Sequence, residues 1–266
     1  MRPPDLSELI IDVPGGGVFT RRWSVPGSKR SPLLLLHDSL GSVEQWRDFP
    51  AALAVATSRS VIAYDRLGFG KSSPRVERPS PGFIEEEAVV VVPALLEALG
   101  IERFVPFGHS VGGGMALTIA ARHGARCEAV ISEAAQAFVE PRTRSGIREA
   151  QRQFADPAQQ ARLVRWHGDK APWVLDAWTQ VWLSPAFTDW TLDHELERIT
   201  CPVLAIHGEH DEYGSLAFPR RIAGGVKGPS QLGLLACGHV PHREKMQEVL
   251  GLVGPFLERS AQGWPG

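Results

Sequence analysis

The stretch "FVPFGHSVGGGMAL", residues 104–117, places Ser110 among closely spaced glycines at the end of an apolar run. Glycine is costly inside regular structure, so it is used where the backbone turns tightly or approaches another segment closely. The residues before the serine have the pattern of a strand, and those after it have the pattern of a helix. This order favours a sharp strand-to-helix turn over a passive glycine-rich loop. It predicts that the Ser110 hydroxyl stands at the carboxyl end of a strand, where open α/β sheets bind ligands.

Around this turn, short apolar runs alternate with longer helical patterns. Runs that are apolar throughout are typical of buried parallel strands, and their alternation with helices predicts a mostly parallel sheet covered on both faces. The expected strands are residues 32–37, 60–65, 103–108, 128–133, 202–208 and 231–238, preceded by an antiparallel pair at about 7–13 and 17–25. The expected helices are residues 47–57, 84–99, 112–123, 216–223 and 242–259.

One segment, from about residue 138 to residue 196, contains no strand-like run. Five of the eight tryptophans fall in it, namely Trp166, Trp173, Trp178, Trp182 and Trp190. We predict that residues 138–196 form a helical cap, inserted between two parts of an α/β core made of residues 1–137 and 197–266.

The predicted cap carries an apolar stripe and a basic stripe. The apolar stripe along residues 172–182 either packs the cap onto the core or lines an apolar pocket, with Trp178 and Trp182 as candidate lining residues. Arg144, Arg148 and Arg152 recur every fourth residue and form one basic face. That face is either solvated or, through Arg148, attracts a carboxylated substrate.

Composition and charge exclude several classes of partner. Lys and Arg total 28 against 30 Asp and Glu, a formal charge of −2, which provides no electrostatic attraction to nucleic acid or an anionic membrane. The three cysteines lie far apart, so we expect free buried thiols in a reducing compartment. With no pattern of a signal peptide or a membrane span, we expect a soluble cytoplasmic protein that acts on a small molecule. The sequence does not indicate the oligomeric state.

A serine hydroxyl is a poor nucleophile at neutral pH and needs a base, which in turn needs an orienting group. Asp211 follows the expected strand 202–208 as the candidate acid, and His239 follows the last expected strand as the candidate base. The alternatives are His242 as the base and Glu209, Glu212 or Glu133 as the acid. His37, His207 and His210 match no ligand spacing for zinc, so we expect no metal.

Five segments together resemble the α/β-hydrolase superfamily, and the resemblance covers nearly the whole chain. They are "LLLLHDSLGS", "VIAYDRLGFGKSS", "LGIERFVPFGHSVGGG", "PVLAIHGEHDEY" and "ACGHVPHRE". The resemblance implies an α/β-hydrolase fold with an eight-stranded sheet, a catalytic triad of Ser110, Asp211 and His239, and no cofactor. It also implies an oxyanion hole formed by the backbone N–H groups of Ser39 and Val111.

The identity of the nucleophile narrows the activity that the resemblance implies. Relatives that open epoxides or remove halogen use aspartate at this position, so serine argues against both reactions. Serine members include carboxylesterases, lactonases, thioesterases, C–C hydrolases of aromatic ring-cleavage products and cofactor-free perhydrolases, and some proteins of this fold are ligand receptors. We expect a serine hydrolase of a small, largely apolar ester.

The resemblance also leads to two structural expectations. Residues 84–99 contain four consecutive valines, which are weak helix formers, yet the family layout predicts a helix there that bends near Pro93 rather than a strand at 88–92. Many relatives have glycine where this chain has Asp38. We expect its carboxylate to point away from Ser110 and to accept a hydrogen bond from the amide of Leu40 or Gly41.

Overall fold

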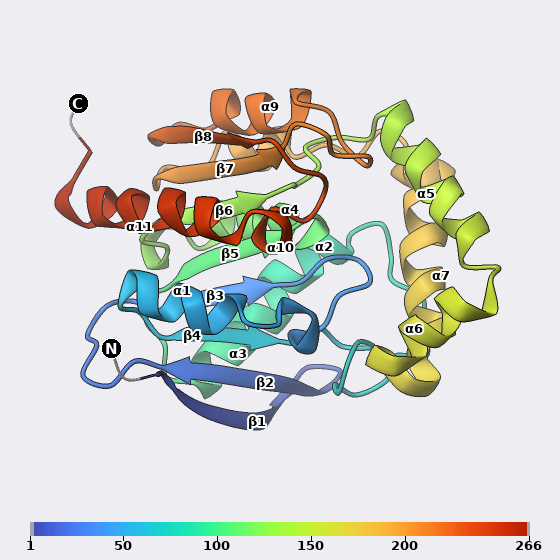
Figure 1. The fold of residues 1–266 in the computed structure, drawn as a ribbon, viewed down its shortest axis with the longest axis horizontal. Coiled ribbons are helices and arrows are strands. Elements are labelled where there is room, and N and C mark those ends of the chain that lie inside the picture. Colours follow the sequence, from blue (N-terminus) through green and yellow to red (C-terminus); the bar gives the residue numbers. More distant parts are fainter. Residues whose placement is uncertain (1–2, 265–266) are drawn as a thin grey trace.

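Residues 3–264 are described by a computed structural model, which contains one eight-stranded sheet in the order β1-β2-β4-β3-β5-β6-β7-β8 (Figure 1). The pairs β1–β2 and β2–β4 are antiparallel, and all other neighbours are parallel. The strands are β1 (Asp5–Val13), β2 (Gly16–Ser24), β3 (Leu33–Leu36), β4 (Val61–Tyr64), β5 (Val105–His109), β6 (Val130–Glu133), β7 (Val203–Gly208) and β8 (Ser230–Leu235). The predicted mostly parallel sheet and its antiparallel start are confirmed.

Helices cover both faces of the sheet because the central strands are apolar on both faces. In β3, Leu34 and Leu36 pack into one apolar layer, whereas Leu33 and Leu35 pack into the other. The first layer includes residues of α3 (Val92–Ala98), α4 (Val111–Arg122) and α9 (Ala217–Gly225), and the second includes residues of α1 (Phe49–Thr57) and α11 (Met246–Gln262).

The valine-rich segment is helical, as the family layout predicts. It consists of α2 (Phe83–Glu86), a π-helical turn (Glu87–Val91) and α3. Val91 and Val92 are only 2% and 0% exposed, so burial of these side chains outweighs their weak helix propensity. The widened turn ends at Val91, with only Val92 between it and Pro93, the residue that cannot donate a helical hydrogen bond.

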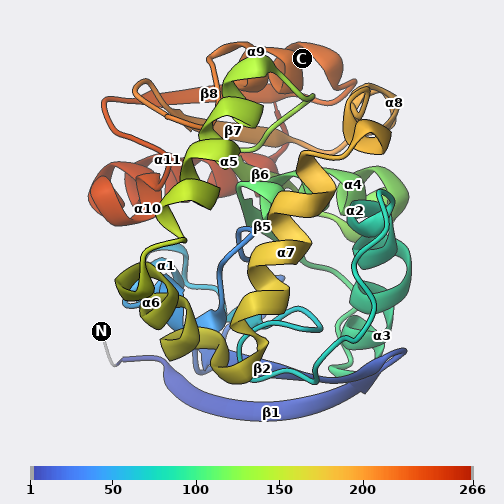
Figure 2. The same ribbon diagram turned by 90° about the vertical axis from the view of Figure 1, so that its right-hand side faces the viewer.

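A helical segment is inserted between β6 and β7 and faces the carboxyl ends of the parallel strands (Figures 1 and 2). It contains α5 (Pro141–Gln153), α6 (Pro157–His167), α7 (Ala171–Trp182) and α8 (Asp193–Leu196). An antiparallel bridge between Phe138 and Thr191 ties its two ends together. The division into a core and a cap at residues 138 and 196 remains a prediction.

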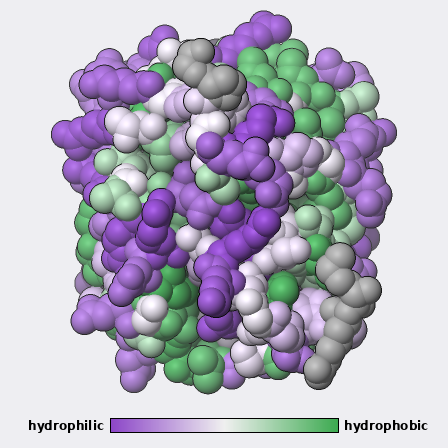
Figure 3. All heavy atoms as spheres, turned by 90° about the vertical axis from the view of Figure 1, so that its left-hand side faces the viewer, coloured by the Kyte–Doolittle hydropathy of each residue, from purple (hydrophilic) through white to green (hydrophobic). Residues whose placement is uncertain are grey.

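The opposite face of the molecule, at the amino ends of the parallel strands, mixes polar and apolar residues (Figure 3). No helix within residues 3–264 is long and apolar enough to cross a bilayer. The short helix α10 (Pro241–Glu244) precedes α11 and follows the segment that carries His239.

Candidate active site

Ser110 occupies the turn between β5 and α4. Its backbone has φ 56° and ψ −124°. Positive φ is strained for a residue with a side chain and tends to occur at functional sites. Backbone hydrogen bonds hold the turn: the Ser110 N–H donates to the Glu133 carbonyl and the Gly113 N–H to the Ser110 carbonyl, both at 2.8 Å, and the Gly114 N–H donates to the Ser110 carbonyl at 3.3 Å. The predicted strand-to-helix turn at Ser110 is therefore present.

The glycines of this turn are required by close backbone approach. A Cβ on Gly108 would lie 1.8 Å from the carbonyl oxygen of Gly112, and a Cβ on Gly112 would lie 2.1 Å from that of Leu36. Side chains at these two positions would push α4 away from β5 and β3. The same packing keeps the Ser110 side chain at the edge of the sheet.

His239 lies between Ser110 and Asp211. Its Nε2 is 3.0 Å from Ser110 Oγ, and its Nδ1 is 2.8 Å from Asp211 Oδ2. Burial raises the pKa of Asp211, but the hydrogen bond and the electrostatic interaction with His239 outweigh this effect, so the pKa is lowered and the carboxylate is ionised at neutral pH. The three residues have the contacts that a nucleophile, a base and its orienting acid require.

The alternative residues lie elsewhere. His242 is in α10, where its Nδ1 is 2.6 Å from Glu133 Oε2. Glu209 and Glu212 are exposed beside Asp211. None of the four contacts Ser110 Oγ or replaces Asp211 at the His239 ring in the described structure.

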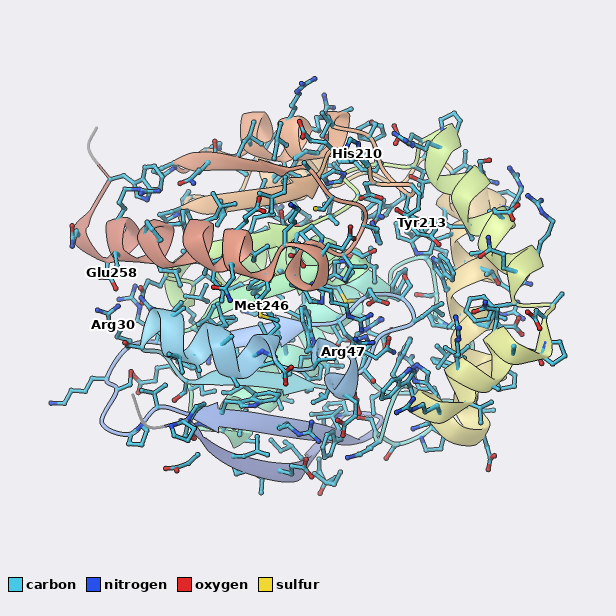
Figure 4. All side chains as sticks on the ribbon, in the orientation of Figure 1. Arg30, Arg47, His210, Tyr213, Met246 and Glu258 are labelled. Carbon is cyan, nitrogen blue, oxygen red and sulfur yellow. The ribbon has the colours of Figure 1, made fainter. Side chains whose placement is uncertain are left out.

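Two further side chains, which the sequence patterns did not single out for this role, surround the acid and the base. His207 Nε2 lies 3.2 Å from Asp211 Oδ2, and burial lowers the pKa of His207 to about 4, so this ring is neutral. The Tyr213 ring lies 4.9 Å from that of His239, between the sheet and the inserted helices (Figure 4). The backbone N–H of Tyr213 donates to Asp211 Oδ1. The spacing of "HGEHDEY" places both residues near Asp211, which is a signal that could have found them.

The backbone N–H groups of Ser39 and Val111 have no acceptor among residues 3–264. Ser39 follows β3, and Val111 is the first residue of α4, where the helix dipole adds positive potential. Both N–H groups are therefore available to an oxyanion. The oxyanion hole itself remains a proposal.

A cavity of about 130 Å³ opens at Ser110. Trp178 and Trp182 of α7 line it, together with Thr143 and Ile147 of α5. Their position supports the pocket alternative for Trp178. Trp182 borders the cavity too, but it is only 2% exposed and packs against Phe187 and Trp190, so for Trp182 both alternatives hold. The remaining lining residues are Asp38, Ser39, Leu40, His109, Ser110, Gln136, Tyr213, His239 and Val240.

The expectation that Arg148 lines the pocket is wrong. Arg148 is exposed, because the face of α5 that meets the cavity carries Thr143 and Ile147. On the basic face of the same helix, Arg144 donates to the Leu183 carbonyl at the end of α7, and Arg152 pairs with Glu149. Arg148 and Arg152 therefore face solvent, and Arg144 caps the carboxyl end of α7.

Comparison with known proteins agrees with this geometry. Residues 31–245 match the family model described as the alpha/beta hydrolase fold. The chain belongs to this family.

Three similar proteins illustrate the range within the family. The chain is 32% identical to the dihydrolipoyllysine-residue acetyltransferase component of the acetoin cleaving system of Pseudomonas putida, over 92% of this chain and 68% of that protein. It is 37% identical to 2-hydroxymuconate semialdehyde hydrolase of Pseudomonas sp. (strain CF600), over 38% of this chain and 35% of that protein. The crystal structure of the enol-lactonase from Burkholderia xenovorans LB400 superposes with a TM-score of 0.73 at 23% identity, covering 94% of this chain and 100% of the other.

The two expectations for Asp38, a bond to a nearby amide and a side chain directed away from Ser110, are met only in part in this alpha/beta hydrolase. The predicted bond is present, since the Leu40 N–H donates to Asp38 Oδ1 at 2.8 Å. The side chain is nonetheless 32% exposed and borders the cavity. Its Oδ2 lies 3.4 Å from Nδ1 of His109. Asp38 is thus a neighbour of the site rather than a residue directed away from it.

Within residues 3–264, one group of side chains has donor atoms close enough together to be considered for a metal. These are His109, Glu133 and His242, with one atom of each within 4.8 Å of the others. Both ring nitrogens of His109 already face other acceptors, and His242 Nδ1 contacts Glu133. We therefore interpret the group as a hydrogen-bonded cluster. The absence of a metal requirement remains a prediction.

Proposed function

We propose that this hydrolase cleaves small, largely apolar carboxylic esters through an acyl-enzyme. The observation that carries the proposal is the position of His239, in contact with both Ser110 Oγ and Asp211 Oδ2 at the mouth of a mainly apolar cavity.

The proposed reaction has two halves. His239 takes the proton of Ser110 as Oγ attacks the acyl carbon, and it then gives that proton to the leaving alcohol. Water, deprotonated by the same ring, releases the acid from acyl-Ser110. The N–H groups of Ser39 and Val111 stabilise the tetrahedral oxyanion, by about 3 kcal/mol each.

The cavity favours a small neutral substrate. Its volume of about 130 Å³ is close to that of the roughly 150 Å³ apolar cavity that binds benzene, so an acyl or alkoxy group about the size of one ring fits. Its lining residues within the described chain include the Asp38 carboxylate but no lysine or arginine. The lining therefore offers no lysine or arginine to pair with a carboxylated substrate.

A C–C hydrolase of aromatic ring-cleavage products is the second candidate, because one relative is a 2-hydroxymuconate semialdehyde hydrolase. The position of Arg148 outside the cavity removes the cation that would favour such a substrate. Lactones and thioesters need the same acyl transfer and remain alternatives, as does a slow ligand receptor on this fold.

A substrate panel tests the proposal. We would measure kcat/KM for p-nitrophenyl esters from acetate to decanoate, a lactone, a thioester and a dienoate ring-cleavage product. The proposal predicts the highest value for a short or single-ring ester. A higher value for the dienoate would establish the second candidate, and labelling of Ser110 by a fluorophosphonate without turnover would favour the receptor.

A further inference from the structure

His109, the residue before the proposed nucleophile, lies between two hydrogen-bond acceptors. Its side chain is 2% exposed. The ring Nε2 is 2.7 Å from the His239 carbonyl oxygen, and the ring Nδ1 is 3.4 Å from Asp38 Oδ2. A carbonyl oxygen can only accept, so Nε2 carries a proton. An ionised carboxylate also only accepts. His109 Nδ1 and Asp38 Oδ2 therefore attract each other only if Nδ1 carries a second proton.

The charges around His109 agree with a protonated ring. Asp38 faces it from the loop after β3 and Glu133 from the end of β6. Two further rings face it, that of His242 in α10 at 4.9 Å and that of His239, from the segment after β8, at 5.1 Å. Burial by itself lowers the pKa of His109, but the Asp38 carboxylate and, less strongly, Glu133 outweigh burial and raise it. Burial lowers the pKa of His242, so the His242 ring is neutral and does not compete for the positive charge.

We propose that His109 is a positioning residue of this site: as an imidazolium it neutralises Asp38 beside the oxyanion loop and holds the His239 backbone next to Ser110. Asp38 directly precedes Ser39, whose N–H is a proposed oxyanion donor. An uncompensated carboxylate there would repel the negative charge that develops in the transition state. The inference rests on the proposed acyl transfer for its effect on rate, but not for the protonation of the ring.

A double-mutant cycle separates charge compensation from a structural role. His109→Gln keeps a donor for the His239 carbonyl but has no charge. In the otherwise unchanged protein it should lower kcat for the best ester by about 100-fold with little change in KM, whereas in an Asp38→Asn background it should cost less than about tenfold. His210→Gln, a change at an exposed histidine near Asp211 (Figure 4), is the matched control. An equal cost in both backgrounds would show a merely structural role and overturn the proposal.

A second measurement does not depend on activity. In protein labelled with ¹⁵N-histidine, both His109 ring nitrogens should show protonated shifts at pH 7, and the His109→Gln variant identifies the signals. Since the pKa is raised, the second proton should leave at a higher pH than that of an ordinary histidine, and it should leave at lower pH in Asp38→Asn. A neutral ring at pH 7 would contradict the inference even if ester hydrolysis is confirmed. A protonated ring in a protein without esterase activity would instead mean that the proposed function is wrong.

Discussion

Among single residues, Ser110 bears the proposed covalent chemistry. Ser110→Ala should lower kcat by ~10⁴-fold or more, because the members of a triad act as a unit. We would measure ester turnover together with fluorophosphonate labelling by mass spectrometry. Ser145→Ala, at an exposed position of α5, should behave like the unchanged protein. If the Ser110→Ala protein still reacts with the probe, another serine is the nucleophile.

Asp211 is proposed to orient His239 and to stabilise its charged form. Asp211→Asn should lower kcat by roughly 10³- to 10⁴-fold, because an amide favours the wrong tautomer of the imidazole. The matched control is Glu212→Gln at the exposed neighbouring position, which should change kcat less than about twofold because surface substitutions are usually small in effect. Steady-state kinetics of the two variants measure the difference. Equal losses of kcat would mean that another residue is the orienting acid.

Among the elements, the close packing of α4 on β3 depends on the absence of a side chain at Gly112. Gly112→Ala should prevent folding or destabilise the protein by more than about 4 kcal/mol, since its Cβ would meet the Leu36 carbonyl at 2.1 Å. Gly114→Ala, in the same helix, should be neutral or stabilising by up to about 1 kcal/mol, because its nearest neighbour is 3.8 Å away. Urea unfolding of both variants measures the difference. Similar stabilities would mean that α4 can shift outward at little cost.

The short helical turn Val43–Trp46 is tied to β2 by an ion pair. Arg21 donates to both oxygens of Glu44, and this contact, assisted by Lys71, lowers the pKa of Glu44 to about 2. A lowered pKa contributes stability that is present above the unfolded value and is lost as pH falls through the folded value. Because Glu44 is 36% exposed, solvent screening limits the contribution to about 1 kcal/mol or less.

Glu44→Gln should therefore lower the free energy of unfolding at pH 7 by this small amount and flatten its dependence on pH between about 4.5 and 2. Urea unfolding at several pH values measures both effects. If the free energy of unfolding of Glu44→Gln depends on pH as in the unchanged protein, other carboxylates cause the loss of stability in acid.

Across the whole molecule, burial protects the thiols. All three cysteines, Cys127, Cys201 and Cys237, are free and buried. Burial raises the pKa of Cys201 to about 11 and that of Cys237, with help from nearby carboxylates, to about 12. Iodoacetamide at pH 8 should label none of them in the native protein and all three in urea, as followed by mass spectrometry. Rapid native labelling of Cys237 alone would show that the segment before His239 opens locally.

Much of the core fold followed from local patterns. The apolar runs that become β3 to β7 are buried on both faces, and the glycines around Ser110 need only a tight turn, so both can be read from adjacent residues. The valine-rich segment shows the limit of local propensity, because burial of Val91 and Val92 makes it helical. There the family layout, rather than propensity, led to the correct prediction.

The order of Ser110, Asp211 and His239 along the chain, together with the family resemblance, was the basis for proposing them as a triad. Each follows a strand whose carboxyl end meets the others at one edge of the sheet. Their contact distances came only from the folded chain. Helical periodicity grouped Arg144, Arg148 and Arg152 on one face, but only the packing of α5 against α7 decided that Ile147 and not Arg148 meets the cavity. The pairing of Asp38 with His109 likewise joins residues from two strand ends, and no local pattern encodes such a contact, because it depends on how separate elements pack.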